Sequence, residues 1–211
     1  MKKLFFIFLI LFVKKAFCQI NRDTTFLLKN MDPNFHQLIF IDKPNSIYHK
    51  KLIENIKESK NEVQEKIKNI TSNFHMKFDK IKFKNQGDWV SIYKFKNRNY
   101  CYYPSEPFFN LFISISDSII ILNDFNEGFT PLLIKKYLIN SNSIIYFLVD
   151  ENKKNIKMKF ILNKDGTASF NCSNFNRKNI MLVRKDSIFK LPIIVNYCPN
   201  YRCAEFKFKN H

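Results

Sequence analysis

Apolar residues change their spacing around Gly87, and this change constrains the fold of the whole chain. Upstream, they recur at the helical period of about 3.6 residues on one narrow stripe, with charged residues opposite. The stripe consists of Leu52, Ile56, Val63, Ile67, Ile70 and Phe74. Downstream, apolar and polar residues alternate, which is the pattern of strands with one buried face. The sequence therefore predicts a helix over about 46–75 and a β domain over 85–211.

Short alternating segments, separated by turns rich in Asn, Ser and Lys, continue to Phe208. Expected strands cover 89–96, 111–116, 118–122, 132–139, 143–149, 156–163, 167–172, 180–184, 189–196 and 204–208. Asp165–Gly166 is a hairpin signal, and no helical crossover separates these segments, so neighbouring strands should pair antiparallel. The predicted fold is mainly β (α+β): an antiparallel up-and-down barrel or sandwich of roughly 8–10 strands, preceded by a long amphipathic helix.

The segment 19–84 precedes this β domain. Thr25–Leu28 and Gln37–Ile41 are candidate short strands for an edge of the sheet, and Asn45–Ser46 offers a helix N-cap. A continuous helix would be about 43 Å long at 1.5 Å per residue, which exceeds the height of a small barrel. It therefore overhangs the barrel or breaks, with 57–61 as its least apolar span. We expect its stripe to pack on the β domain rather than on a membrane, because the stripe is narrow.

Residues 1–18 have the three parts of a secretory signal peptide. Lys2–Lys3 precede the apolar run Leu4–Val13, and the small residues Ala16 and Cys18 follow it. The apolar run is too short to span a bilayer comfortably. We expect cleavage after Cys18 and a secreted or periplasmic protein with no transmembrane span in the mature chain. Lipidation of Cys18 and an uncleaved anchor are the alternatives.

The chain is strongly basic, with a formal net charge of +17. Such a charge attracts nucleic acid, anionic lipid or acidic polysaccharide. Arginine, whose fork reads bases and phosphates, occurs only at 22, 98, 177, 184 and 202. Residues with A/T-rich codons (Lys, Asn, Ile, Phe and Tyr) are abundant, so genome composition accounts for much of the charge. Nucleic acid is therefore not an expected partner.

Four cysteines remain after Cys18, an even number that permits two disulfides in an exported chain. Cys198 and Cys203 flank Pro199–Asn200 and form the expected local pair. Cys101 and Cys172 would then form a long-range bond between strands, and buried thiols are the alternative. We expect no metal site, because none of the histidines has ligand spacing from the cysteine pair.

Motifs of the common enzyme classes are absent from the sequence. Only three glycines occur, too few for a phosphate-binding loop, and neither a Gly-x-Ser-x-Gly nor a His-Glu-x-x-His motif is present. The histidines His36, His49, His75 and His211 are expected to be solvated or on helix faces. The sequence therefore predicts a protein without cofactors that is not an enzyme. A Tyr-rich stretch, Tyr100–Tyr103, is expected to be a loop suited to a binding rim.

The pattern Asn85-x-Gly87-x-Trp89 resembles the Asn-x-Gly-x-Trp motif of the lipocalin (calycin) superfamily. In that family the motif opens the first barrel strand, and its Trp packs across the closed end of the barrel. A basic residue late in the barrel commonly covers this Trp, and Arg184 is the counterpart that the resemblance implies. The resemblance covers about 83–190, and the family's Thr-Asp-Tyr segment is not found.

Two functions follow as expectations. The first is a lipocalin-like protein that binds a small apolar ligand or a surface partner without covalent chemistry. The alternative is an exported interaction module that uses its Lys-rich helix to bind acidic envelope polymers or membranes. A hydrolase acting on envelope components is a third hypothesis, for which the sequence offers no catalytic constellation.

Overall fold

The computed structural model describes residues 24–32, 35–73, 85–106, 111–124, 128–173, 177–199 and 203–208. The expected signal peptide 1–18 with Cys18, as well as Phe74, His75 and His211, lie outside the described residues. The described elements are twelve strands, two α-helices and one 3-10 helix.

The strands are β1 (Thr25–Asp32), β2 (Phe35–Asp42), β3 (Gly87–Phe95), β4 (Arg98–Tyr103), β5 (Phe112–Ile115), β6 (Ile119–Asp124), β7 (Gly128–Ile139), β8 (Ser143–Val149), β9 (Asn155–Leu162), β10 (Ala168–Cys172), β11 (Arg177–Arg184) and β12 (Ile193–Tyr197). The helices are α2 (Ile47–Glu62), α3 (Gln64–Asn73) and the 3-10 helix η2 (Lys185–Lys190).

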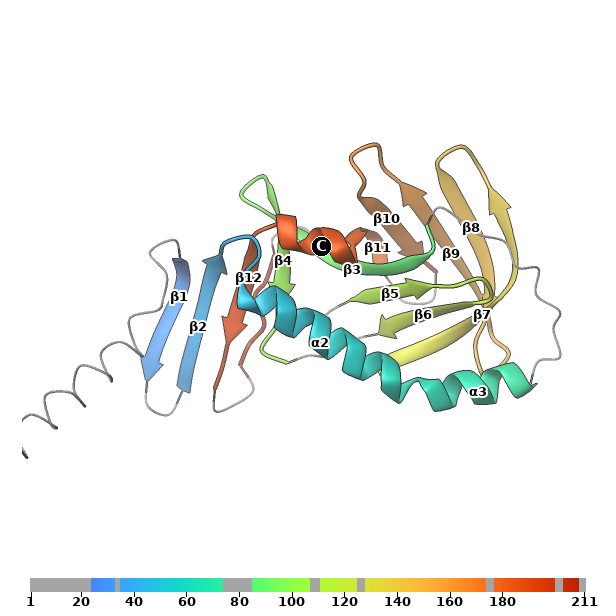
Figure 1. Ribbon diagram of the computed structural model, residues 1–211, viewed down its shortest axis with the longest axis horizontal. Coiled ribbons are helices and arrows are strands. Elements are labelled where there is room, and N and C mark those ends of the chain that lie inside the picture. Colours follow the sequence, from blue (N-terminus) through green and yellow to red (C-terminus); the bar gives the residue numbers. More distant parts are fainter. Residues whose placement is uncertain are drawn as a thin grey trace, which may run out of the picture.

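Eight of the strands close into an antiparallel barrel. β3 pairs with β11 on one side, where Trp89 lies opposite Arg184, and with β5 on the other, where Trp89 lies opposite Ile113. Between these two pairings the sheet runs β11-β10-β9-β8-β7-β6-β5, so each strand from β5 to β11 pairs with the next one in the chain (Figure 1). The mainly β prediction is confirmed, and the barrel is formed rather than the sandwich.

β3 continues past the barrel and begins an extension of the sheet. Its last residues, Tyr93–Phe95, pair with β4, and the order then runs β4-β12-β2-β1 (Figure 1). β12 runs parallel to β4, with Ile193 opposite Cys101, so the expectation of antiparallel pairing throughout is wrong here. The chain passes through η2 between β11 and β12, and this longer connection frees β12 from the direction that a tight hairpin would impose.

The Tyr-rich stretch expected to be a loop is the strand β4. Tyr100, Cys101 and Tyr102 are all buried, at 0–5% exposure. Both faces of this short strand are covered, so no alternation of apolar and polar residues marks it in the sequence.

The predicted helix is formed, and it breaks rather than overhangs. Ser46 caps α2: its hydroxyl accepts a hydrogen bond from the Tyr48 N–H at 3.2 Å, within a capping box completed by His49. The break falls at Val63, two residues beyond the expected span. Val63 is itself buried, so the apolar stripe continues across the break, and α3 packs Ile70 against Leu133 and Val149.

The helices cover part of the outer wall of the barrel. α2 and η2 lie across one face in Figure 1, and α3 continues this cover onto β7. Outward-facing residues of β3, β5, β6 and β11 are buried in the same cluster as Leu52 and Ile56 of α2; they include Val90, Ile92, Phe112, Ile121 and Val183. On β9, by contrast, the outward-facing residues Asn155, Lys157 and Lys159 are exposed. The barrel therefore has a covered and an open side.

A half-buried carboxylate ties α2 and η2 to the barrel. Asp88 of β3 accepts hydrogen bonds from Lys60 of α2 at 2.9 Å, from Lys185 of η2 at 2.8 Å and from Ser114 of β5 at 2.8 Å. Burial alone would raise the pKa of Asp88, but these hydrogen bonds outweigh it and hold the pKa below its ordinary value. The carboxylate is therefore ionised at neutral pH, where the two ammonium groups are charged.

Asp88→Asn should lower the free energy of unfolding by about 1–3 kcal/mol, because it leaves two half-buried ammonium groups without their anion. Chemical denaturation with circular dichroism measures the change. Glu54→Gln on the exposed side of α2 is the control, and it should shift stability by less than about 0.5 kcal/mol. Equal effects of the two substitutions would contradict the role given to Asp88.

Candidate functional site

The motif residues meet at one end of the barrel. Trp89 is 1% exposed, its indole N–H donates to the Asn85 carbonyl at 2.8 Å, and its ring lies 5.0 Å from that of Phe160. The buried Asn85 amide nitrogen lies 2.8 Å from the Tyr146 hydroxyl inside the barrel. Burial raises the pKa of Tyr146 to about 12, so its hydroxyl stays protonated and does not serve as a base at neutral pH.

Arg184 covers the outer side of Trp89. Its guanidinium carbon lies 4.3 Å from the centroid of the indole ring, and its Nη1 donates to the Gln86 carbonyl. Gly87 lies between them with φ +110°, and a Cβ atom at Gly87 would be 2.6 Å from Arg184 Nη1. Asn85, Gly87, Trp89 and Arg184 therefore form one cluster that closes this end of the barrel. Each of these residues contacts another member of the cluster, an arrangement that suits structural packing and not catalysis.

Gly87→Ala should destabilise the fold more than Gly166→Ala, because both positions have positive φ but only Gly87 also lacks room for a Cβ. We expect a difference of about 1–2 kcal/mol in the free energy of unfolding. In an Arg184→Ala background this difference should shrink, giving a coupling of about 1 kcal/mol in a double-mutant cycle. Unfolding curves of the single and double variants provide the measurement; additive effects would show that Arg184 does not restrict Gly87.

The interior of the barrel is filled by apolar side chains. Eighteen buried residues form one cluster, and the exposed fraction of each is at most 8%. After Trp89, its largest members are Tyr146, Phe160 and Phe170, and none of their surface is exposed. A side chain that lined a cavity large enough for water would have solvent-accessible surface, and these three have none. They therefore pack against their neighbours in the middle of the barrel. Tyr137, Leu162 and Ile180 are partly buried at the margins of the cluster.

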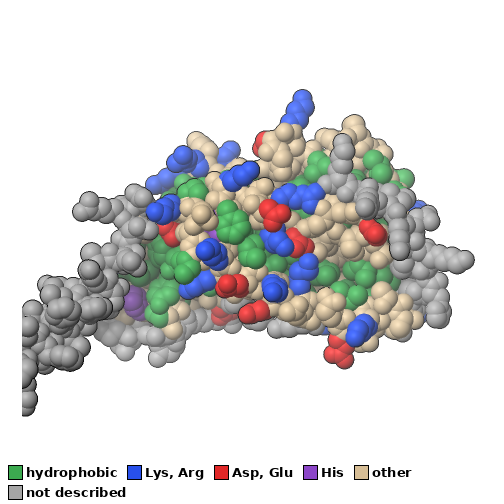
Figure 2. Space-filling model, in the orientation of Figure 1, with side chains coloured by type: hydrophobic (Ala, Val, Ile, Leu, Met, Phe, Trp, Pro, Cys, Tyr) green, Lys and Arg blue, Asp and Glu red, His purple; other side chains and the backbone are tan. Residues whose placement is uncertain are grey.

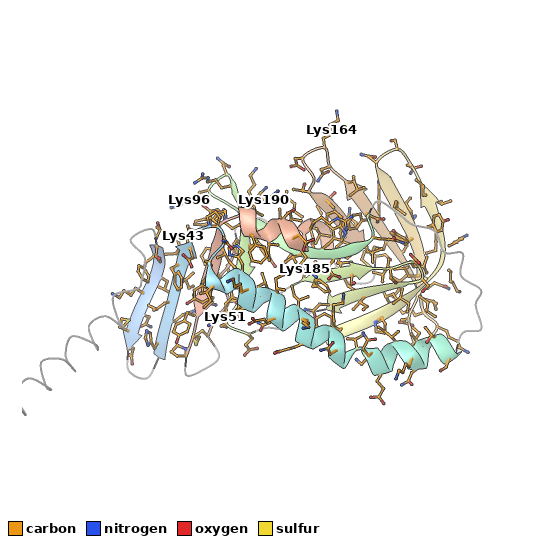
Figure 3. All side chains as sticks on the ribbon, viewed as in Figure 1. Lys43, Lys51, Lys96, Lys164, Lys185 and Lys190 are labelled. Atoms are coloured by element: carbon orange, nitrogen blue, oxygen red, sulfur yellow. A yellow bond between two sulfur atoms is a disulfide. The ribbon has the colours of Figure 1, made fainter. Side chains whose placement is uncertain are left out.

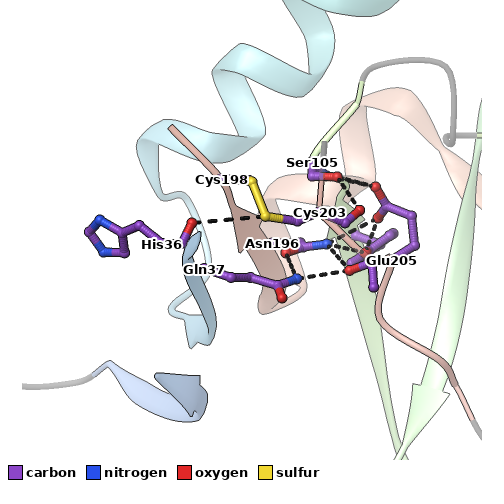
Figure 4. The surroundings of a disulfide bond; sticks show 9 residues. His36, Gln37, Ser105, Asn196, Cys198, Cys203 and Glu205 are labelled. Carbon is purple, nitrogen blue, oxygen red and sulfur yellow. Dashed lines mark hydrogen bonds between the residues drawn. A yellow bond between two sulfur atoms is a disulfide. The ribbon is translucent and has the colours of Figure 1, made fainter. Parts of the chain in front are cut away.

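The local disulfide between Cys198 and Cys203 is confirmed, with Cα atoms 6.1 Å apart (Figure 4). The expected bond between Cys101 and Cys172 is wrong, because both are buried thiols. Cys172 points into the barrel, whereas Cys101 belongs to the cluster between the sheet and α2, so the wall of the barrel separates them. Burial raises the pKa of the Cys101 thiol to about 12, which makes it a poor nucleophile.

The disulfide holds the C-terminal segment 203–208 against the extension of the sheet. The Glu205 carboxylate accepts hydrogen bonds from Tyr102, Ser105 and the Asn196 amide, and Gln37 donates to the Ala204 carbonyl at 2.8 Å (Figure 4). A strand was expected here and is not formed. Phe206 and Phe208 instead cover an aromatic cluster, and the Phe208 ring is stacked on Tyr93 at 4.3 Å. The alternating apolar residues that predicted this strand instead pack one face of the segment on the sheet, and the segment does not pair with a neighbouring strand.

His49 lies in the first turn of α2 and is buried, so of the two expectations for it the helix position is met and solvation is not. Its Nδ1 accepts a hydrogen bond from the Ser46 N–H at 3.2 Å, and its Nε2 donates to the Leu191 carbonyl at 3.0 Å. The ring therefore joins the start of α2 to the end of η2 as a neutral imidazole. Burial lowers the pKa of His49, although these backbone contacts oppose the shift. Its surroundings suit a helix cap and not acid–base chemistry.

The free energy of unfolding should fall as the pH decreases below about 6.5, because the unfolded chain then binds a proton that the folded His49 resists. Above this pH the contribution of His49 is fully present. His49→Gln should flatten the dependence between about pH 6.5 and 5.5, where carboxylates titrate little. Urea denaturation at several pH values tests this; an unchanged slope in His49→Gln would refute it.

Lysines lie on both sides of the barrel, in two different settings. On the covered side, Lys and Arg are interspersed with Asp and Glu over α2 and η2 (Figure 2). Exposed Lys50, Lys51 and Lys57 of α2 alternate with Glu54 and Glu58. A smaller group, Lys43, Lys51, Lys96 and Lys190, lies around the junction of α2, the β3–β4 turn and η2 (Figure 3). The Lys-rich helix therefore presents both signs of charge.

The open side of the barrel has a different composition. We define the open wall by six outward-facing residues of β7, β8 and β9: Lys136, Leu138, Ile145, Phe147, Lys157 and Lys159. Phe147 of β8 lies between Lys136 of β7 and Lys157 of β9, whose Nζ atoms are 4.7 and 5.9 Å from the centroid of its ring. None of the six is acidic. Sequence reasoning missed this surface, although the alternating lysines of 156–163 were its signal.

Comparison with protein-family models, with curated proteins and with solved structures found no match. No helix among the described residues is long and apolar enough to cross a membrane. The described residues also contain no group of three or more His, Cys, Asp or Glu side chains that could hold a metal ion.

Proposed function

We propose that this protein is an exported, lipocalin-like binding protein without enzymatic activity. Its barrel serves as a rigid scaffold, and it binds an acidic component of the cell envelope through its basic outer surface. The small apolar ligand, which belongs to the first of the two expectations from the sequence, is the less favoured occupant.

The observation that carries this proposal is the filled interior. Tyr146, Met158, Phe160 and Phe170 occupy the middle of the barrel with none of their surface exposed. A ligand in that place would have to displace packed side chains, which costs several kcal/mol for each large residue moved. The surfaces that remain for binding are therefore outside the barrel, where basic residues outnumber acidic ones.

The chemistry of the described side chains favours binding over catalysis. Burial places the pKa values of Cys101 and Tyr146 near 12, and His49 is fixed between two backbone groups. Nucleophiles and general bases need accessible groups with pKa values near neutrality. The resemblance to lipocalins is supported by the Asn85–Trp89 cluster at the end of a closed eight-strand barrel.

Chromatography on immobilised heparin and uptake of an apolar fluorescent probe together test the proposal. The protein should be retained at about 0.02 M salt and should elute as screening shortens the Debye length toward about 8 Å near 0.15 M. It should not take up the probe with a saturable 1:1 stoichiometry. Passage through the column at low salt would contradict the proposal, and saturable probe uptake would support an interior ligand instead.

A further inference from the structure

The β7–β8 hairpin ends in two exposed aliphatic residues. Leu138 is 54% and Ile139 58% exposed, whereas few other large apolar side chains of the described residues reach such values. The neighbouring β9–β10 hairpin lies beside it, since the Leu162 N–H donates to the Asn142 carbonyl at 2.8 Å. The two aliphatic residues lie on opposite faces of β7: Leu138 is outward, beside Ile145, and Ile139 is opposite Ile144 on the inner face, at the rim of the barrel. Both leave apolar surface in water at the hairpin tip, which is a cost.

Lysines surround this apolar tip and continue down the open wall. Lys159 lies beside Ile145, which pairs with Leu138, and Lys164 projects from the β9–β10 turn (Figure 3). Further along the wall, Lys136 and Lys157 flank Phe147. The other outward positions of this wall on β9 and β10, which are Asn155, Ile161, Ser169 and Asn171, are uncharged.

Acidic residues near this surface lie in the turns. Asp165 of the β9–β10 turn is bound to Thr167, and Asp150 of the β8–β9 turn accepts a hydrogen bond from the Lys154 N–H. Glu151 is exposed in that second turn, next to Lys153 and Lys154. The strands themselves therefore present a positive surface without interruption by acids, unlike α2 with its alternating Lys and Glu.

An apolar tip bordered by lysines fits a lipid surface better than a soluble polymer. A polyanionic chain satisfies the lysines but leaves Leu138 and Ile139 in water. At an anionic bilayer, by contrast, aliphatic side chains enter the boundary between headgroups and acyl chains while lysines meet the phosphates. Lysine stems also extend along apolar surface and keep their ammonium groups in the headgroup layer.

We propose that the open wall docks on an anionic lipid bilayer, with Lys136, Lys157 and Lys159 against the headgroups and with the β7–β8 tip entering edge-on, so that Leu138 and Ile139 on its two faces are both inserted. This inference rests on the proposed binding of an acidic partner and names both the partner and the surface. The covered side of the barrel, with α2 and η2, then faces away from the lipid.

Sedimentation with vesicles tests the proposal on the whole protein. We compare phosphatidylcholine vesicles with vesicles that also contain about 30 mol% phosphatidylglycerol, a strongly anionic surface. The protein should partition at least about tenfold more strongly into the anionic vesicles, and salt should weaken this. Leu138→Ser with Ile139→Ser should lower partitioning about tenfold, and Lys136→Gln with Lys157→Gln and Lys159→Gln about 100-fold.

Matched controls place exchanges of the same type elsewhere on the surface. Lys43→Gln with Lys51→Gln and Lys190→Gln removes the same charge from the covered side, and Leu28→Ser with Met31→Ser changes exposed apolar residues of β1. Both should change partitioning less than about threefold, a smaller loss than removing headgroup contacts. Leu138→Trp should shift its fluorescence to the blue on anionic vesicles, because native Trp89 is buried and contributes a constant background.

Each failure has a distinct meaning. Equal partitioning into both kinds of vesicle, equal losses in control and open-wall variants, or an unshifted emission spectrum of the Leu138→Trp variant would overturn lipid docking by this face. Retention on heparin without vesicle binding would overturn the lipid proposal and leave the proposed function standing, with an acidic polymer as the partner. Absence of both would overturn the two together. Unchanged far-ultraviolet circular dichroism of each variant establishes that its fold is intact.

Discussion

The pairing of β3 with β5 determines the architecture, because together with the pairing of β3 with β11 it closes the eight-strand barrel. Asp88 and Trp89 lie in this seam, opposite Ser114 and Ile113. Closure places Trp89 inside, against Phe160, and leaves Asp88 outside, where Lys60 and Lys185 reach it. One short stretch of β3 therefore both closes the barrel around its core and attaches the helices to it.

Closure also gives the outer wall two unlike sides. The helices need an apolar surface for their stripe, and the outward residues of β3, β5, β6 and β11 provide it. Most outward positions of β8 and β9 lie on the far side of the barrel and are not covered by the helices; there Lys157 and Lys159 of β9 lie beside Phe147 and Ile145 of β8. The interior is filled with side chains and the helices are packed against the barrel. The open wall is therefore the surface that contributes least to the stability of the fold.

The sequence predicted those features that depend on local spacing. The period of two located most barrel strands, Ser46 located the start of the helix, and Cys198 and Cys203 were close enough to pair. It did not predict features set by distant contacts. β4 lacks alternation because both of its faces are buried, 204–208 alternates without pairing, and Cys101 and Cys172 lie on opposite sides of a wall that only closure creates. His49 gave no signal, because its acceptor at Leu191 lies far along the chain.

Amide-resolved hydrogen exchange in β5 tests closure most directly. In a closed barrel, the Phe112–Ile115 amides that pair with β3 should exchange as slowly as those of the central strand β9, because both open only with the whole fold. β1 is an internal reference, since it ends the described sheet with one unpaired edge and should exchange much faster. If the amides of β5 that face β3 exchanged as fast as those of β1, β5 would be an open edge, and the barrel described above would not exist.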